Sequence, residues 1–352
     1  MSYRPPELFS VNWSKPATTA GGAILEITGS NFGDDRKLVS VSVGSVPCDV
    51  TKLVRHQTLF CTVGAGFGID LPLRVCVDSQ CVDSGKGEGN SGTFSYDAPT
   101  VETISFLNNN TKATTEGGFT LVISGSNFGP LHSGSISLMR AYIYAPPFAE
   151  VSCGNLTMIR AHHELHCISP SGQGKDKRIR LETLASTTST STRRLMTIST
   201  MGFSYARPLL DRSSTLKLGP TSGGNSVVIR GQNFGSTASL VTVNIGGTGR
   251  CSNPSLHNDS HLFCTAEAGQ GHSHLVKVTV SGQTTGAHHD LDVLLMASYD
   301  APEILSVEPR TVEPGQTLLI TGRLAPSYSH HACRALTVFT CRTQFRCSIA
   351  GA

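Results

Sequence analysis

Three stretches of the chain follow the same order of residues, and this repetition limits the possible folds more than any other feature. Each stretch runs from a Gly-Gly pair through Gly-x-Asn-Phe-Gly and two cysteines to a Ser-Tyr strand and a proline. The motif residues are Gly29, Asn31, Phe32 and Gly33, then Gly125, Asn127, Phe128 and Gly129, and then Gly231, Asn233, Phe234 and Gly235. A unit of roughly a hundred residues has the size of a small domain and is too long for a solenoid repeat. The sequence therefore predicts a string of similar domains.

Within each copy, apolar and polar residues alternate in short runs that are separated by turn residues. Leu25 and Ile27 belong to one such run, and residues 71–77 form another. A period of two residues indicates half-buried strands, and no part of the sequence indicates a helix. About seven such strands in ~100 residues predict an all-β, immunoglobulin-like sandwich. The Phe of each Gly-x-Asn-Phe-Gly motif is expected to pack under its loop in the core.

This order of features resembles the IPT/TIG family, the immunoglobulin-like domains of plexins, Met-type receptors, fibrocystin-like proteins and a class of transcription factors. The resemblance lies in the Gly-Gly pair, the strand ending Ile-x-Gly, the Gly-x-Asn-Phe-Gly motif and the cysteine pair, and it extends to about Gly322. Three full copies and a truncated fourth are expected. Their ranges are residues 5–99, residues 100–208 with a disordered Ser/Thr-rich insertion at 183–200, residues 209–301, and residues 302–322. Residues 323–352 receive no assignment.

Six of the eleven cysteines occupy matching positions in the repeats. Equal spacing in three divergent copies predicts one disulfide per repeat, and a fourth bond is expected within a hairpin. Each bond would stabilise its domain by ~3 kcal/mol. Buried thiols and a metal site are the alternatives, but one pair per domain cannot supply four zinc ligands. The candidate pairs are Cys48 with Cys61, Cys76 with Cys81, Cys153 with Cys167, and Cys251 with Cys264, whereas the pairing of Cys333, Cys341 and Cys347 stays open.

The predicted disulfides require an oxidising compartment, so the chain is expected outside the cell or on its surface. Four Asn-x-Ser/Thr sequons agree with this location, and the N-glycosylation candidates are Asn12, Asn109, Asn155 and Asn258. The opening residues contain no signal peptide, and no apolar run of ~18 residues could span a membrane. Because the first repeat begins at once, the chain is expected to be a piece of a longer protein.

No catalytic, metal or cofactor site is predicted. Neighbouring histidines such as His162 and His163 point to opposite faces of a strand, and no carboxylates complete a ligand set. Asp34-Asp35 has no counterpart in the other copies, and calcium requires six or more oxygen ligands. The glycine-rich residues 85–89 lie between strands rather than before a helix, which is where a phosphate-binding loop would lie. The chain is therefore expected not to be an enzyme.

Three functions are compared. The first is non-enzymatic: the repeats act as spacers in a cell-surface or secreted protein and bind protein ligands or a neighbouring cell. The second is a carbohydrate-binding module of a secreted enzyme, with Tyr142 and Tyr144 in an insertion at residues 130–149 as its aromatic platform. The third is DNA binding, as in the transcription-factor branch, but a net charge of +3 provides no basic surface for nucleic acid. The first function is expected.

Overall fold

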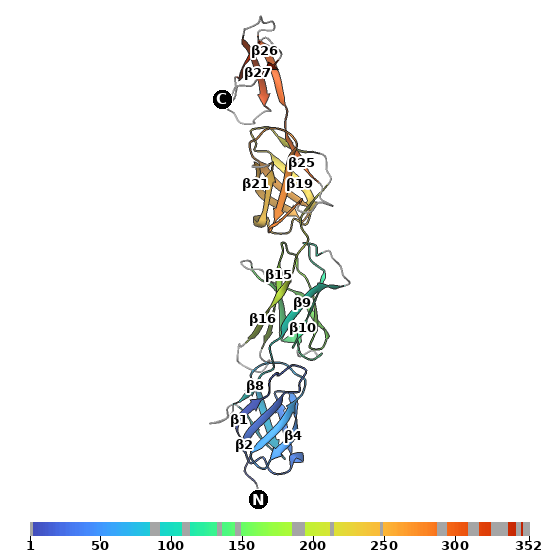
Figure 1. Ribbon diagram of the computed structural model, residues 1–352, viewed down its shortest axis with the longest axis vertical. Helices are drawn as coiled ribbons and strands as arrows, with labels where there is room; N and C mark the ends of the chain where they lie inside the picture. Colours follow the sequence, from blue (N-terminus) through green and yellow to red (C-terminus); the bar gives the residue numbers. More distant parts are fainter. Residues whose placement is uncertain are drawn as a thin grey trace. The chain divides into compact units, whose positions relative to one another are not determined.

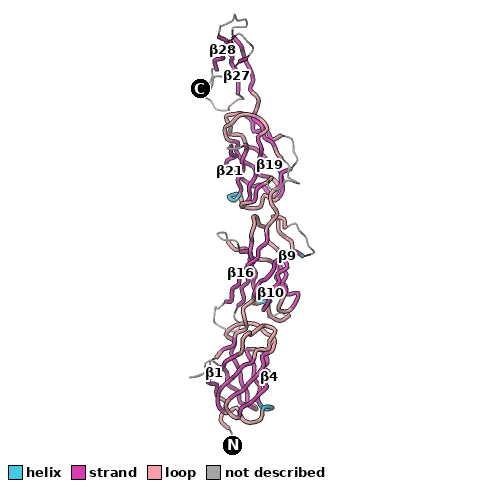
Figure 2. Tube along the Cα trace, in the orientation of Figure 1, coloured by secondary structure: helices cyan, strands magenta, loops and turns pink. Residues whose placement is uncertain are grey.

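The computed structural model describes residues 3–84, 92–107, 113–131, 136–144, 149–184, 194–211, 215–246, 249–286, 294–308, 317–324, 337–342 and 346–347. These residues form β-strands and, as short helical turns, η1 (Arg36–Leu38) and η3 (Ala238–Leu240) (Figures 1 and 2). No helix of the described part is long and apolar enough to cross a membrane.

The chain divides into two compact units. One contains Met1–Ala113, Gly117–Pro170 and Asp176–Ser204, and the other contains Thr114–Glu116, Ser171–Lys175 and Tyr205–Ala352. The repeat boundaries at Pro99 and Pro208 stay a prediction. The immunoglobulin-like sandwich itself is confirmed, because each repeat folds into mostly antiparallel strands around its own core.

The first repeat is one curled sheet with the strand order β1-β2-β5-β4-β3-β6-β7, and β8 pairs with β6. Its strands are β1 (Glu7–Trp13), β2 (Ile24–Ser30), β3 (Val39–Val43), β4 (Val46–Val54), β5 (Thr58–Val63), β6 (Leu71–Val77), β7 (Gln80–Asp83) and β8 (Thr93–Phe94). The strands predicted at Leu25–Ile27 and at residues 71–77 are therefore confirmed.

One strand of this sheet passes from one side of the sandwich to the other. From Val46 to Cys48, β4 pairs with β3, and from Cys48 to Val54 it pairs with β5. Cys48 belongs to both ladders and so occupies the corner. Its disulfide partner Cys61 lies on β5, and the two residues are 4% and 0% exposed.

In the middle repeat, the same corner separates two four-stranded sheets, ordered β13-β14-β10-β9 and β12-β11-β15-β16. Their strands are β9 (Thr100–Phe106), β10 (Thr120–Ser126), β11 (Met139–Tyr144), β12 (Val151–Ser152), β13 (Gly154–Arg160), β14 (Glu164–Ile168), β15 (Lys177–Leu184) and β16 (Arg194–Phe203). Cys153 lies between β12 and β13 and forms a disulfide with Cys167 of β14. The bond therefore joins the corner to the opposite sheet.

The third repeat has the order β17-β19-β22-β21-β20-β23-β25-β18, with β24 on β23. Its strands are β17 (Leu209–Leu210), β18 (Leu216–Gly219), β19 (Ser226–Gln232), β20 (Val241–Ile245), β21 (Gly249–Asn258), β22 (His261–Ala266), β23 (His274–Val280), β24 (Gln283–Thr284) and β25 (Met296–Tyr299). Cys251 pairs in register with Val243 and with Ala266, and its disulfide reaches Cys264 on β22.

Four further strands follow: β26 (Pro302–Glu308), β27 (Thr317–Leu324), β28 (Thr337–Arg342) and β29 (Arg346–Cys347). They pair in the order β26-β27-β28-β29, and Cys341 is opposite Cys347 in register. Residues 323–352 received no assignment from the sequence, and residues 323–324, 337–342 and 346–347 among them belong to strands. Cys333 lies outside the described residues.

Two segments that the sequence marked as insertions contain strands instead. Residues 139–144 form β11, which pairs with β15 as β3 pairs with β6 in the first repeat. Residues 183–184 and 194–200 belong to β15 and β16, which pair antiparallel, so the expected disordered loop was wrong there. Residues 185–193 lie outside the described part of the chain.

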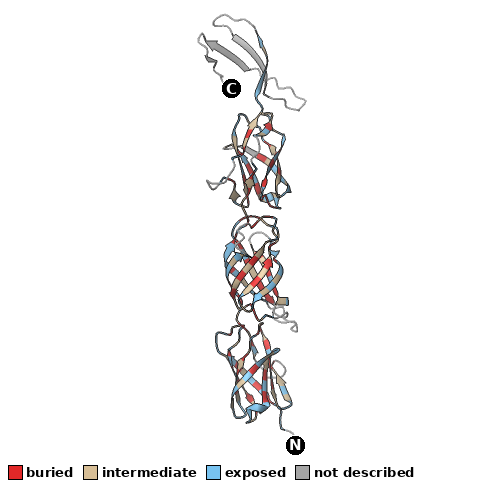
Figure 3. Cartoon of the chain, turned by 90° about the vertical axis from the view of Figure 1, so that its right-hand side faces the viewer, coloured by how far each residue is buried: buried red, intermediate tan, exposed pale blue. Residues whose placement is uncertain are grey.

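Alternation along the strands produces the core, with buried and exposed residues changing every second position (Figure 3). Phe32, Phe128 and Phe234 are completely buried, so the predicted packing of the motif phenylalanines is confirmed. Tyr96 and Tyr299, of the closing Ser-Tyr strands, donate their phenol hydrogens to the carbonyls of Gly64 and Glu267 at 2.9 and 2.8 Å. Burial raises the pKa of Tyr96 to about 12, which keeps this donor protonated.

In each repeat, a buried hydroxyl accepts a hydrogen bond from a backbone N–H of an inner strand. The contact lies where the ladder between this strand and its outer neighbour is irregular. The pairs are Ser84 Oγ with Leu73 N at 2.8 Å, Ser199 Oγ with Ile179 N at 2.9 Å, and Thr285 Oγ1 with Val278 N at 3.1 Å. The three hydroxyl residues are 5%, 1% and 6% exposed. Because an unpaired buried N–H is costly, these hydroxyls allow the neighbouring strand to depart from the ladder.

We expect the Cys153→Ala/Cys167→Ala double variant to lose ~3 kcal/mol of stability, because its disulfide closes a loop of 14 residues. Differential scanning calorimetry should show a lower melting temperature for the transition of the middle repeat. The Cys76→Ala/Cys81→Ala variant is the control, since that bond closes only 5 residues and should cost about 2 kcal/mol. An unchanged melting curve for the first variant would contradict the structural role of the corner disulfide.

Ser199→Ala should destabilise the middle repeat by about 1–3 kcal/mol, because the Ile179 N–H would lose its partner inside the sandwich. Hydrogen exchange at the Ile179 amide should accelerate correspondingly. Thr200→Ala, one residue further along β16 and exposed, is the matched control and should change stability by less than ~0.5 kcal/mol. Equal effects of the two substitutions would rule out the hydroxyl contact.

Candidate functional site

The three Gly-x-Asn-Phe-Gly loops have the same geometry. Asn31, Asn127 and Asn233 adopt φ values of 60°, 61° and 62°. Their side-chain amides donate to the carbonyls of Pro5 at 3.0 Å, Ala98 at 3.3 Å and Arg207 at 3.0 Å. Each asparagine therefore ties its loop to the segment that directly precedes the first strand of its repeat.

The same loops are also fixed from the opposite side by a turn. In the first repeat the N–H of His56 donates to the Gly33 carbonyl at 2.8 Å, and in the middle repeat that of His162 donates to Gly129 at 2.7 Å. In the third repeat, Asp259 accepts from the N–H groups of Asn233 at 3.1 Å and Gly235 at 2.8 Å. With their polar groups occupied in this way, the loops are structural.

The histidines that were considered as metal ligands do not assemble into a metal site within the described residues. His163 Nδ1 lies 3.1 Å from the Gly125 carbonyl, and His166 Nε2 lies 3.0 Å from Glu164 Oε1. Within the described ranges, no group of three or more His, Cys, Asp or Glu side chains could hold a metal ion. His288, His289 and residues 85–89 lie outside these ranges.

The sequons remain predictions for glycosylation. Asn12, Asn155 and Asn258 are exposed, and they lie on β1, β13 and β21. The last two lie between the paired cysteines of their repeats, in strands rather than in loops. Asn109 lies outside the described residues.

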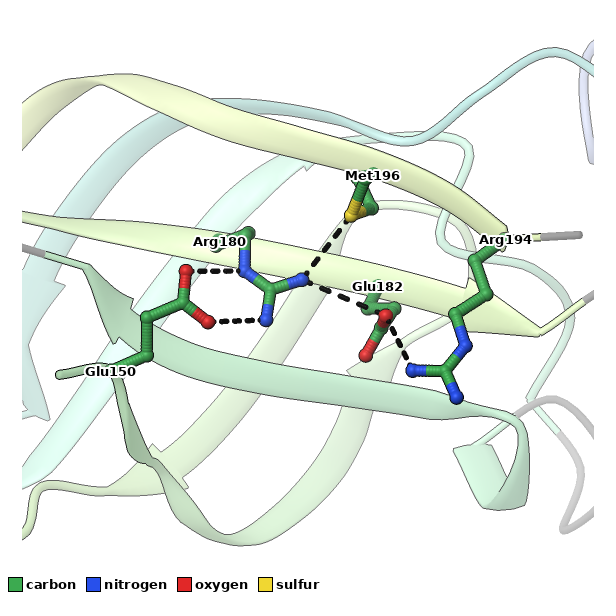
Figure 4. A network of polar contacts seen from close by, with 5 residues as sticks. All are labelled: Glu150, Arg180, Glu182, Arg194 and Met196. Carbon is green, nitrogen blue, oxygen red and sulfur yellow. Dashed lines mark hydrogen bonds and ion pairs between the residues drawn. The ribbon is translucent and has the colours of Figure 1, made fainter.

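The outer face of the β12-β11-β15-β16 sheet carries a polar network that the motifs did not reveal (Figure 4). Arg180 of β15 is at its centre, and its guanidinium forms a two-pronged contact with Glu150, with Nε 2.8 Å from Oε1. Its Nη1 lies 3.6 Å from Glu182 Oε1 and 3.4 Å from the sulfur of Met196. Arg194 of β16 donates to the same Glu182 oxygen at 2.8 Å.

The electrostatics of this network favour the ionised form of Glu182. The Glu182 side chain is 5% exposed, and the hydrogen bond from Arg194 lowers its pKa while burial acts in the opposite direction. The hydrogen bond to Glu150 raises the pKa of Arg180. A buried carboxylate that is hydrogen-bonded to Arg194 and ion-paired with Arg180 is held in one orientation, so the face is rigid at its centre.

Tyr142 lies beside this network but cannot provide the aromatic platform that a sugar would need. The Arg180 guanidinium lies over its ring, 4.5 Å from the centroid. Tyr144 is two residues further along β11 on the same face. With one ring face of Tyr142 covered by a cation, the geometry favours protein contacts over sugar stacking.

Gly29→Ala should destabilise the first repeat by about 3 kcal/mol, because a Cβ there would overlap the Glu7 carbonyl oxygen and the Phe32 ring. Chemical denaturation of the variant measures this loss. Gly22→Ala is the control: its φ is +90° but nothing lies within 4 Å of an added Cβ, so it should cost only about 1 kcal/mol. Similar losses of stability at both positions would show that the close packing around Gly29 does not determine which residue can occupy this position.

Comparison with known proteins agrees with this architecture. Residues 10–96 and 212–291 match the sequence model of the IPT/TIG domain. Fibrocystin-L of Homo sapiens is 26% identical over 265 residues, which cover 72% of this chain and 5% of fibrocystin-L. The chain therefore spans only a small part of that relative.

Several solved structures also resemble the chain. The plexin A4 extracellular region is 16% identical, with 89% of this chain and 31% of plexin A4 covered at a TM-score of 0.25. The ICAM-5 D1–D4 ectodomain fragment is 13% identical, with 91% of this chain and 84% of the fragment covered at a TM-score of 0.28. The surface glycan-binding protein PbSGBP-B from Prevotella bryantii is 9% identical, with 84% of this chain and 96% of PbSGBP-B covered at a TM-score of 0.36. TM-scores of this size do not establish a shared arrangement of domains.

The sequence matches, the β-sandwich repeats and the disulfide in each repeat lead to one conclusion. The chain is therefore similar to proteins built from tandem IPT/TIG domains, with matches to the family in its first and third repeats.

Proposed function

We propose that this chain is a non-enzymatic, extracellular repeat region whose sandwiches bind protein ligands. The observation that carries the proposal is the buried disulfide at the corner of all three repeats, with cysteines that are 0–4% exposed. Such bonds persist outside the cell and are rare in the cytosol. The exposed sequons are compatible with the same compartment.

Protein binding follows from what the repeats offer on their surfaces. Their loops are occupied by internal hydrogen bonds, so the exposed faces and edges of the sheets are what a partner can contact. The relationship to fibrocystin-L supports an extracellular repeat protein but does not identify the partner. The carbohydrate alternative has no supporting geometry at Tyr142, and the net charge of +3 gives no support to DNA binding.

The protein should behave as an oxidised, non-glycan-binding chain. Alkylation of natively isolated protein followed by mass spectrometry should leave Cys48, Cys153 and Cys251 unmodified and recover their peptides linked to the partner peptides. A glycan array and a DNA titration over increasing salt should both give no specific binding, because Arg180 covers one ring face of Tyr142 and a net charge of +3 attracts DNA only weakly. Reduced protein alkylated in parallel is the control.

Three other results would contradict the proposed function. Alkylated corner cysteines in native protein would remove the extracellular assignment and reopen the intracellular functions. Specific glycan binding with intact disulfides would favour the carbohydrate-binding module. Salt-dependent DNA binding would favour the transcription-factor function.

A further inference from the structure

The three repeats present the same sheet face with different side chains at matched positions. The match follows from the registers of β3 with β6, β11 with β15 and β20 with β23. The outward pairs are Ser40–Cys76 and Ser42–Arg74 in the first repeat, Arg140–Glu182 and Tyr142–Arg180 in the middle repeat, and Thr242–Thr279 and Asn244–Lys277 in the third. On β3 and β20 the outward residues of these pairs are small and polar, whereas β11 has Arg140 and Tyr142 at the matched positions.

The next strand of the sheet differs in the same way. In the first repeat the outward residues of β7 are Cys81, bonded to Cys76, and Asp83, 3.6 Å from Arg74. In the third repeat Thr284 of β24 bonds to Thr279 at 2.8 Å. These side chains are satisfied within their own sheets.

In the middle repeat these edge positions are apolar and open. Met196 is opposite Glu182 and Ile198 is opposite Arg180, and the two residues are 63% and 42% exposed. They project from β16, which is the terminal strand of its sheet and spans ten residues, Arg194–Phe203. The corresponding β7 has four residues and β24 has two.

The fold does not require this composition, because two copies of the same sandwich form without it. Tyr, Arg and Met are the residues enriched in the cores of protein interfaces, whereas Ser is depleted there. Arg180, clamped by Glu150 and Glu182, also gives the face a fixed centre before any partner arrives. Pre-organised side chains of this kind lower the entropic cost of binding.

The charges on the face determine which partner fits it. Four arginines, at positions 140, 178, 180 and 194, stand against two glutamates, Glu150 and Glu182, so the face has a surplus of two positive charges. Both glutamates are engaged by Arg180, and Glu182 also by Arg194. Arg178, opposite Tyr144, is exposed and has no ion-pair or hydrogen-bond partner among the described residues. Its guanidinium is available to a carboxylate from outside.

We propose that the outer face of β11, β15 and β16, formed by Tyr142, Tyr144, Arg178, Arg194, Met196 and Ile198, binds an extended acidic segment of a partner protein. This rests on the proposed function that the repeats bind protein. Carboxylates of the segment meet Arg178 and Arg194, and its apolar side chains cover Met196 and Ile198. A sulfated glycan would satisfy the arginines but would leave these two apolar side chains in water, so a protein segment is the better occupant.

The experiment selects peptides with the intact chain as the probe. A yeast-displayed library of random linear peptides is enriched for binders, and each enriched peptide is then titrated on variants of the chain. We expect Asp or Glu to alternate with apolar residues in the enriched peptides. We also expect Arg178→Glu and Met196→Asp each to weaken binding about tenfold or more, as changes at central contact residues do. Binding should weaken as the salt concentration rises.

Matched controls come from the third repeat. Lys277→Glu reverses an outward charge at the position equivalent to Arg180, and Val228→Asp alters an apolar residue that is 37% exposed. Neither should change the affinity, and all four variants should keep the melting temperature of the parent. Binding that is unaffected by Arg178→Glu and Met196→Asp would overturn the proposal, as would failure to enrich any peptide.

The outcomes also distinguish this proposal from the function on which it rests. Enriched peptides that bind the parent but are lost on the control variants would place protein binding elsewhere, so the proposed function would stand and this face would be wrong. Heparin binding that is lost on Arg178→Glu, without peptide binding, would assign the face to a sulfated glycan and overturn both. Alkylation of the corner cysteines tests the extracellular assignment independently of either result.

Discussion

Each repeat depends on one strand that leaves one sheet and joins the other, and on the disulfide that holds this corner. Cys48 and Cys251 take part in two ladders at once, and Cys153 occupies the break between β12 and β13. Strands that switch sheets form the corners of such sandwiches, and a covalent bond at the corner attaches it to a neighbouring strand. The buried sulfur bridge to the neighbouring strand provides that attachment. With only 38% hydrophobic residues in the chain, each thin core benefits from a covalent restraint.

Once the corner is fixed, the far end of the sheet is free to vary. The last strand is β7 and β8 in the first repeat, the continuous β16 in the middle repeat, and β24 and β25 in the third. Ser84, Ser199 and Thr285 supply the acceptor that the inner strand needs at the irregularity in each case. One buried oxygen therefore permits three different edges on the same sandwich, and differences in surface chemistry become compatible with a common fold.

Residues that the fold itself requires were predictable from the sequence. The motif glycines, the buried phenylalanines and the cysteine pairs recur because each solves the same steric or packing problem in every copy. The errors lie where local composition misled. The Ser/Thr-rich run at residues 183–200 suggested a loop, although β-branched threonine suits a strand, and β11 lies within residues 130–149, for which an insertion was predicted.

The network around Arg180 was not predictable for a different reason. Glu150, Arg180, Glu182 and Arg194 belong to different parts of the chain and meet only through the registers of β11, β15 and β16. No motif or spacing marks them, since outward positions of a strand tolerate almost any polar residue. Alternation would have assigned Tyr142, Arg180 and Ile198 to one face only after β11 and β16 had been recognised as strands.

An exposed apolar edge is hazardous for a protein, because an unpaired strand can pair with a second copy of the same chain. The first and third repeats protect their edges with short strands and with internally satisfied side chains. The outer face of β16 exposes the apolar side chains of Met196 and Ile198, but this face has a surplus of positive charge. Two such faces repel each other, whereas an acidic segment is attracted to either of them. The same arginines that select a partner therefore also oppose self-association, which is why an apolar edge of this length is compatible with a discrete chain.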